Sequence, residues 1–168
     1  YFEAIAHFEN VYRSTRHRFF SVSKEATKQL LQAVYCLGFC YCELCLFEKA
    51  FYYLNMVKST GDIHYAMEYV NVLANSGDLR VFKEIETIVD DVRQQFTDDD
   101  DVPEHVQKLL SFLKRRHGYS LIEFGKLDEA EKVFKSLLDD PTSQDYAVSE
   151  LAYIQKLKAN ESPESSEA

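Results

Sequence analysis

The sequence is poor in the two residues that most often turn or break a chain, with five glycines and three prolines in 168 residues. An all-β protein needs many turns and usually more of both residues, so this scarcity argues against that class. No apolar run reaches the roughly 18 residues that a membrane-spanning helix requires. No secretory leader is visible either, and the two absences together predict a cytoplasmic location. The chain begins at Tyr1 without a methionine, which suggests a piece of a longer protein.

Positive charge is also scarce. Nineteen lysines and arginines stand against 28 aspartates and glutamates, for a formal net charge of −9. A nucleic acid needs a basic surface, so the composition argues against a nucleic-acid partner. We interpret the two short basic stretches as solvated faces, with docking points for an acidic partner as the alternative: Arg13, Arg16, His17 and Arg18, and Lys114, Arg115, Arg116 and His117.

The sequence lacks the motifs of common enzymes and metal sites. It contains no G-x-S-x-G, P-loop or G-x-G-x-x-G, and its five histidines show no H-E-x-x-H spacing, so we predict no enzyme and no cofactor. The run Asp98–Asp101 lacks the alternating ligands, glycine and terminal glutamate of a calcium loop, which favours a solvated loop.

Four cysteines lie close together, at Cys36, Cys40, Cys42 and Cys45. Their spacing is not a standard zinc or iron–sulfur pattern. On a helix, at about 100° per residue, their side chains point around much of the circumference and cannot converge on one ion. We therefore predict small buried apolar residues and no metal, with a structural metal site and a redox-sensitive exposed thiol as alternatives.

Apolar residues recur at i, i+3, i+4 and i+7 along nearly the whole chain, which predicts about eight amphipathic helices. We expect these helices near residues 1–12, 24–44, 47–58, 63–75, 79–95, 103–124, 127–138 and 143–158. Ser23, Asp62 and Asp101 are candidate N-caps, and Pro103 suits the first turn of a helix. Residues 159–168 are polar and acidic and should not pack.

One pattern returns along the chain. The spacing of Gly38, Tyr41, Ala50 and Leu54 is repeated by Gly118, Leu121, Ala130 and Phe134, and such self-similarity is typical of repeat architectures. A glycine inside a helix costs about 0.5–1 kcal/mol relative to alanine, and is tolerated where a neighbouring helix crosses too close for a side chain. We predict close crossings at Gly38 and Gly118, with Ala50 and Ala130 as the small residues on the facing helices.

The pattern resembles the tetratricopeptide repeat, a helix–turn–helix unit of about 34 residues. Residues 31–58 match it in Leu37, Gly38, Tyr41, Leu44, Phe47, Ala50 and Leu54, and residues 111–142 match it in Gly118, Gly125, Leu127, Ala130, Phe134 and Pro141. The first unit departs at Val34, where the family prefers tryptophan, and at Cys45, where the turn prefers glycine. The second departs at Lys114 and His117. A middle unit near 63–92 keeps Gly77-Asp78-Leu79 at its turn but is otherwise degenerate.

The resemblance implies an all-α, right-handed superhelical solenoid of antiparallel helix pairs. Its parts would be a half repeat at 1–18, repeats at about 24–58, 62–96 and 103–140, a capping helix at 143–158 and a polar tail at 159–168. The half repeat has no partner upstream. We therefore expect an uncovered apolar flank on the first helix, with Ile5 and Tyr12 as candidates, and either a missing segment or a homodimer contact to cover it.

The resemblance also implies a function, namely non-catalytic protein–protein interaction by a scaffold or adaptor that binds a partner peptide or helix on its concave face. That face would carry Gln32, Tyr35, Phe39, Glu43, His64, Met67, Asn71, Phe112, Arg115, Tyr119 and Ile122. Aromatic residues, methionine and arginine are enriched at interfaces, and Arg115 would be the charged anchor. The alternatives are that these residues form inter-repeat core, that the chain is a self-association module, or that it is the peptide-sensing domain of a larger regulator.

Overall fold

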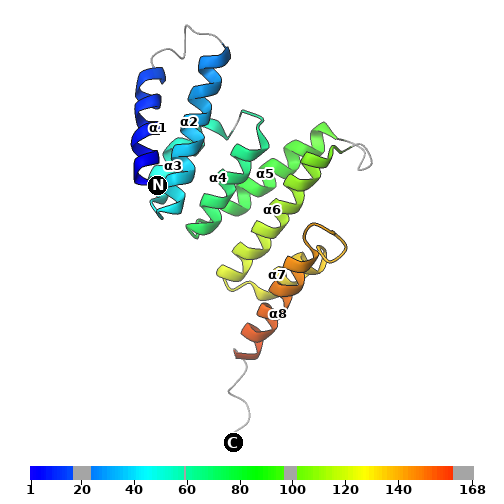
Figure 1. Cartoon of the computed structure of the whole chain (residues 1–168). Coiled ribbons are helices and arrows are strands. Elements are labelled where there is room, and N and C mark those ends of the chain that lie inside the picture. The colour runs from blue at the N-terminus through cyan, green and yellow to red at the C-terminus, as the bar shows by residue number, and fades with distance from the viewer. Residues whose placement is uncertain (17–23, 59, 97–101, 161–168) are drawn as a thin grey trace, which may run out of the picture. The chain divides into compact units, whose positions relative to one another are not determined.

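The computed structural model describes residues 1–16, 24–58, 60–96 and 102–160, and in these ranges the chain is all-helical and has no strand (Figure 1). The all-α class predicted from the sequence is therefore confirmed. Its helices are α1 (Phe2–Thr15), α2 (Lys24–Glu43), α3 (Phe47–Val57), α4 (Ile63–Asn75), α5 (Arg80–Gln95), α6 (Glu104–Glu123), α7 (Leu127–Lys135) and α8 (Gln144–Asn160). None of the helices in this described part is long and apolar enough to span a membrane.

The helix ends lie close to those predicted. Asp62 caps α4 as expected, because its carboxylate accepts a hydrogen bond of 2.9 Å from the backbone N–H of His64. Helix α7 ends three residues earlier than predicted, since the N–H groups of Leu137 and Leu138 bond to carbonyls three residues back and tighten the last turn. The predicted caps Ser23 and Asp101 and the acidic loop 98–101 lie outside the described residues, as do residues 161–168 of the predicted tail.

Two helix–helix turns have the same backbone geometry. At the first turn, Cys45 N–H bonds to Cys42 O and Leu46 N–H bonds to Tyr41 O; at the second, Gly125 N–H bonds to Ile122 O and Lys126 N–H bonds to Leu121 O. This is the Schellman pattern, which needs a left-handed residue just after the helix. Cys45 has φ 55° and Gly125 has φ 71°, so a cysteine occupies the position that glycine occupies in the second copy.

The contacts divide the chain into two compact units, Tyr1–Ser76 with α1–α4 and Gly77–Ala168 with α5–α8. The boundary falls inside the predicted repeat 62–96, whose two helices belong to different units. The pairing of α4 with α5 as one repeat therefore stays a prediction.

The two units differ in charge. Residues 1–76 hold seven basic and seven acidic side chains, whereas residues 77–168 hold twelve basic and twenty-one acidic ones. The first unit is therefore neutral in formal charge, and the whole excess of nine negative charges belongs to the second.

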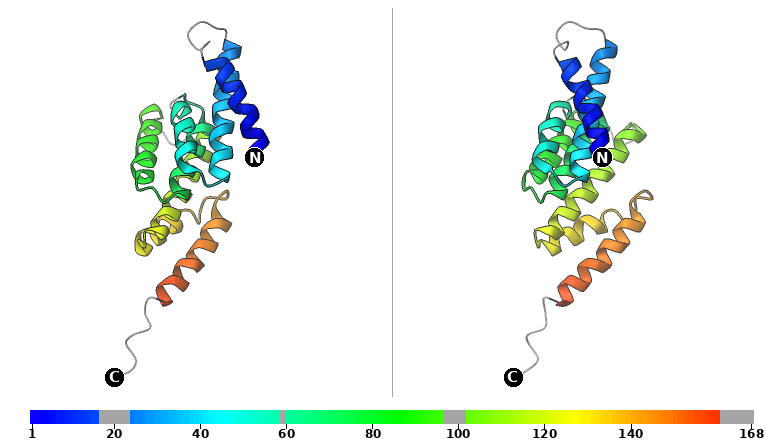
Figure 2. Two further views of the ribbon diagram at one scale, coloured as in Figure 1. Left: turned by 90° about the vertical axis from the view of Figure 1, so that its left-hand side faces the viewer. Right: turned by 60° about the vertical axis from the view of Figure 1, so that its left-hand side comes forward.

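In the first unit, α2 lies beside α1 and runs in the opposite direction, and it also packs against α3 (Figures 1 and 2). Helix α3 contacts α4 in turn. Apolar side chains at helical spacing fill the space between these helices, among them Leu30, Val34, Leu37, Leu54, Val57, Val70 and Leu73. The core of this unit thus follows the apolar stripes read from the sequence.

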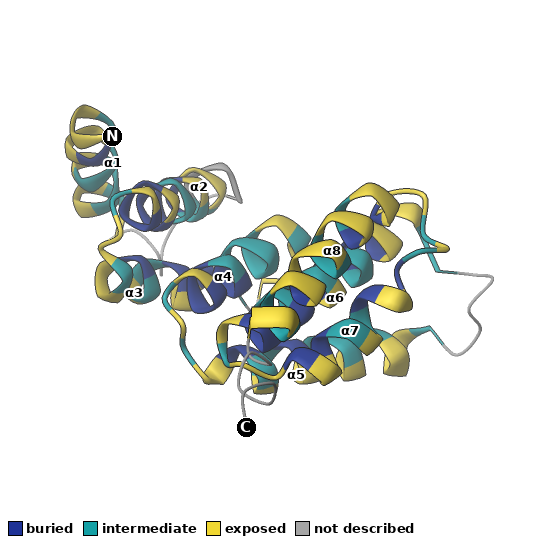
Figure 3. Ribbon diagram, turned by 90° about the horizontal axis from the view of Figure 1, so that it is seen from below, coloured by how far each residue is buried: buried dark blue, intermediate teal, exposed yellow. Residues whose placement is uncertain are grey.

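In the second unit, α6 packs against α5 and α7, and α7 packs against α8. One core cluster joins α6, α7 and α8 and includes Leu121, Ala130, Phe134, Leu137 and Ile154. Figure 3 shows the helices with dark blue buried residues on one side and yellow exposed residues on another, as amphipathic helices require.

The predicted close crossings at Gly38 and Gly118 are present. A methyl group added at Gly38 would collide with the Leu54 side chain, whose Cδ2 would lie 2.6 Å away, and one added at Gly118 would lie 2.6 Å from Cζ of Phe134. The nearest atoms therefore belong to Leu54 and Phe134, while Ala50 and Ala130 are fully buried close by in sequence. Only glycine fits at these two positions without a shift of the facing side chain or of its helix.

Candidate functional site: a face of α2 and α4

Helices α2 and α4 of the first unit lie next to each other. The rings of Tyr35 and Tyr65 meet at 5.1 Å between centroids, and Asn75 Nδ2 lies 4.0 Å from the sulfur of Cys42. Burial, followed by the negative charge of Glu68, raises the pKa of Tyr35, so its hydroxyl stays protonated at neutral pH. The first helices of two successive predicted repeats are thus neighbours in this unit, as the resemblance implies.

The predicted interface residues of this unit fall on one stripe of each helix. Positions 32, 35, 39 and 43 of α2 are three or four residues apart, as are positions 64, 67 and 71 of α4, and such spacing places side chains on one helix face. All seven retain solvent contact. Those that are exposed are Gln32, Phe39, Glu43 and His64, and those that are half-buried are Tyr35, Met67 and Asn71. We call these seven residues the α2/α4 face.

One end of the α2/α4 face is in contact with the start of α1. The ring of Tyr1 lies edge-on to Phe39 at 6.3 Å, and its hydroxyl donates a 2.9 Å hydrogen bond to Oε2 of Glu43. This hydrogen bond is the main reason that the pKa of Tyr1 is raised. The sequence did not predict this contact, because Tyr1 lies outside the stretches that match a repeat.

Asn71 contributes an unused acceptor beneath the α2/α4 face. Its Nδ2 donates to Oε2 of Glu68 at 3.4 Å, whereas its Oδ1 is buried and has no hydrogen-bond partner among the described residues. An unpaired buried polar atom is unfavourable, so a donor that reached Oδ1 would stabilise this part of the structure.

The predicted interface residues of the second unit have a different environment. Phe112 and Ile122 are only 8% and 7% exposed. They are buried in that unit, which favours the alternative that these two residues form core over an open groove. Arg115 lies over the ring of Tyr146 on α8, 5.8 Å from its centroid, and Tyr119 lies under the guanidinium of Arg116 at 5.7 Å. The role of Arg115 as an anchor for a partner stays a prediction.

The cysteines show no arrangement for a metal. Cys40 and Cys42 are buried, Cys36 is half-buried and Cys45 is exposed. No group of three or more histidine, cysteine or acidic side chains in the described ranges is placed to hold an ion. Burial raises the pKa of Cys36 and Cys40 and raises that of Cys42 to about 11, so these thiols stay protonated at neutral pH.

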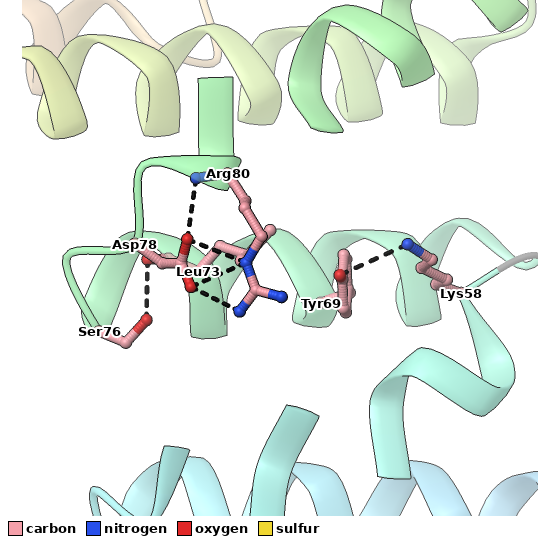
Figure 4. A network of polar contacts seen from close by, with 6 residues as sticks. All are labelled: Lys58, Tyr69, Leu73, Ser76, Asp78 and Arg80. Carbon is pink, nitrogen blue, oxygen red and sulfur yellow. Dashed lines mark hydrogen bonds and ion pairs between the residues drawn. The ribbon is translucent and has the colours of Figure 1, made fainter. Parts of the chain in front are cut away.

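Polar contacts lie at the ends of α3 and α4 in the first unit and, separately, at the start of α5 in the second. Lys58 Nζ lies 4.4 Å from the ring centroid of the buried Tyr69 and donates to its hydroxyl at 3.4 Å, and Ser76 donates to the carbonyl of Leu73 (Figure 4). Asp78 accepts hydrogen bonds from the backbone and the guanidinium of Arg80, and those from the side chain are the main cause of its lowered pKa. These contacts lie at helix ends.

A pocket lined by tyrosines, between α1, α2 and α3, was missed by sequence reasoning and is described below. Its residues come from three helices and are distant in sequence, so no short motif predicts the pocket. Comparison with protein-family models, with curated proteins and with solved structures gives no match to this chain.

Proposed function

We propose that the chain is a non-catalytic interaction domain, a scaffold or adaptor that binds a peptide or helix of a partner protein along the α2/α4 face. The observation that carries this proposal is the adjacency of α2 and α4, with all seven predicted residues at or near the surface. In this proposal the helix pairs form a right-handed solenoid of the tetratricopeptide type, and the domain works in the cytoplasm.

The repeated local geometry supports the proposed solenoid. The Schellman turns at Cys45 and Gly125 and the close crossings at Gly38 and Gly118 are two copies of one helix–turn–helix design. A design that occurs twice in one chain, at matching sequence positions, is what a repeat architecture requires.

The chemistry of the face favours a peptide with apolar anchors. Phe39 is 36% exposed, and Tyr35 and Met67 offer partly open apolar surface beside the polar Gln32 and His64. Aromatic residues and methionine are enriched at protein interfaces, and tyrosine is enriched among the residues that contribute most to binding. A backbone or side-chain donor of the peptide would satisfy Oδ1 of Asn71.

A photocrosslinking experiment tests this proposal. Benzoylphenylalanine placed at Phe39 should crosslink a partner in cells that express the chain, and the same group at Leu46 serves as the control. Leu46 is a 43% exposed residue of the same unit that lies off the face. The crosslink should disappear when Tyr35 is changed to Ala. Identical crosslinked products from both positions would contradict the proposal.

Self-association through α1 is the second candidate, because Phe2 is 75% exposed. The flank predicted from Ile5 and Tyr12 does not support it, since Ile5 is buried and the ring of Tyr12 packs edge-on against Tyr53 at 5.5 Å. Ile5 is therefore covered, contrary to the prediction, whereas Tyr12 is only half-buried. A sedimentation experiment in which Phe2→Ser abolishes a concentration-dependent dimer would favour this candidate.

A further inference from the structure

Three helices of the first unit line a pocket of about 250 Å³. Its walls are Glu9 of α1, Tyr41 of α2, and Glu48, Lys49, Tyr52 and Tyr53 of α3. We call it the tyrosine pocket. It shares no residue with the α2/α4 face, and it is slightly smaller than the roughly 300 Å³ at which pockets for drug-sized ligands begin. It therefore suits a single small group.

The tyrosine rings of the pocket hold one another in place. Tyr41 and Tyr53 stack with centroids 5.8 Å apart and ring planes at 4°, and Tyr52 meets Tyr53 edge-on at 5.1 Å. Tyr12 packs edge-on against Tyr53 at 5.5 Å. Each ring contacts at least one other, and the faces of such rings carry negative electrostatic potential.

Two carboxylates line the pocket, and one of them is already paired with an arginine. The Tyr41 hydroxyl donates a 2.8 Å hydrogen bond to Oε1 of Glu9, while Arg13 pairs with Oε2 of the same carboxylate at 3.3 Å. Burial, together with this hydrogen bond, raises the pKa of Tyr41 to about 12, so the ring is a neutral phenol at physiological pH. Glu48 supplies the second carboxylate. Neutral rings beside carboxylates are complementary to a positive charge.

The chain already places one of its own cations there. Nζ of Lys49 lies over the ring of Tyr41, 5.1 Å from its centroid, and the Lys49 side chain is exposed. This contact shows that a cation has both the room and the attraction to sit on the ring. A primary ammonium is strongly hydrated and only weakly held at an exposed site, whereas alkylated ammonium groups are the cations that aromatic cages recognise.

We propose that the tyrosine pocket binds an alkylated ammonium group, such as a quaternary amine or a trimethylated lysine side chain, which displaces the ammonium of Lys49. The site is independent of the proposed peptide-binding face. Both kinds of ligand carry one alkylated cationic group, which would pack against the rings of Tyr41, Tyr52 and Tyr53. The free amine and the modified side chain are the two sources of that group.

The test is an NMR titration of the whole chain. Choline should show a saturable upfield shift of its N-methyl signal from the ring currents, and 3,3-dimethylbutan-1-ol, which has the same shape without the charge, should not. A peptide with one trimethyllysine should bind more tightly than the same peptide with unmodified lysine. The tighter of choline and the trimethyllysine peptide identifies the source. Equal binding of the neutral alcohol, or binding of neither cation, would overturn the proposal.

Three variants make the titration specific. Lys49→Met keeps an unbranched side chain, one atom shorter, but removes the competing charge, so it should tighten choline binding by about 2- to 5-fold. Tyr52→Ala should weaken binding by about 2- to 5-fold; because Tyr52 is 58% exposed, the fold should be retained, which circular dichroism checks. Tyr153→Ala, at a 49% exposed tyrosine of α8, is the matched control and should bind like the parent chain. No effect of Lys49→Met and Tyr52→Ala would overturn the proposal.

Discussion

Cys45 occupies a backbone position that glycine fills elsewhere in this chain. Its φ of 55° lies in the left-handed region, like the φ of 66° at Gly77 and of 71° at Gly125. For a residue with a side chain this region costs about 1–2 kcal/mol, and glycine avoids most of that cost. We therefore expect Cys45→Gly to increase the free energy of unfolding by up to about 1 kcal/mol, as measured in urea.

Gly125 provides the matched control for this substitution. Gly125→Ala introduces the same strain at the equivalent turn, and nothing else lies within 4 Å of the added methyl. The free energy of unfolding should therefore fall by about 1 kcal/mol. If both variants unfolded at the parent's midpoint, the equivalence of the two turns would be wrong.

Gly38 tests the close crossing of α2 and α3. Gly38→Ala would normally favour a helix, but its methyl would overlap the fully buried Leu54 side chain, so a neighbouring group would have to shift. We expect a loss of about 1–3 kcal/mol in the free energy of unfolding. In a double-mutant cycle, Gly38→Ala should cost less in a Leu54→Ala background, because the space is then free. Additive losses would show that the contact is not the cause.

At the scale of the element, Asp140 organises the turn that leads into α8. Both the backbone N–H and the hydroxyl of Thr142 donate to its Oδ1, at 2.9 and 2.7 Å. Burial alone would raise the pKa of Asp140, but the hydrogen bonds around it lower the pKa from 3.8 to about 2. A depressed folded pKa means that the carboxylate stabilises the native state above about pH 4 and that this contribution is lost as the pH falls towards 2.

The prediction is therefore a difference in acid sensitivity. The free energy of unfolding of the parent chain should fall between about pH 4 and pH 2. The free energy of unfolding of the Asp140→Asn variant should fall less steeply over the same range. The exposed neighbour Asp139 gives the control Asp139→Asn, which should keep the parent's slope. Denaturant titrations at several pH values make the comparison. Parallel curves for the parent and Asp140→Asn would refute this role.

Helix positions were predictable because each depends on local pattern. The apolar spacing located α4 to the residue, and the capping chemistry of Asp62 fixed its start. The close crossings at Gly38 and Gly118 were predictable because an interior glycine needs a packing reason. The contact of Tyr1 with Phe39 and the tyrosine pocket were not predictable, since they join residues from different helices whose docking no local pattern encodes.

The burial of Phe112 and Ile122 shows another limit of sequence reasoning. Helix α6 has neighbours on two sides, α5 and α7, so its apolar residues cover a wide arc. Periodicity identifies such residues as apolar, but it does not say which part of the arc another helix will cover. Both were assigned to an open face on family resemblance, and both are buried.

At the scale of the whole molecule, the second unit has a hydrophobic core of its own, as an independently folding domain requires. Its core cluster draws on α6, α7 and α8, and its large side chains Phe134 and Leu137 are almost completely buried. We expect a fragment of residues 77–168 to show a helical circular dichroism spectrum and one cooperative thermal transition. A fragment that stays unfolded would mean that this core needs the first unit.

The distribution of charge has a consequence for handling the protein in solution. A protein without net charge has little electrostatic repulsion between its copies and tends to precipitate, and residues 1–76 have formal charges that cancel. We expect the nine excess negative charges of the second unit to oppose association of the whole chain at neutral pH. We therefore expect the first unit to precipitate more readily when it is produced alone than when it is fused to an acidic partner.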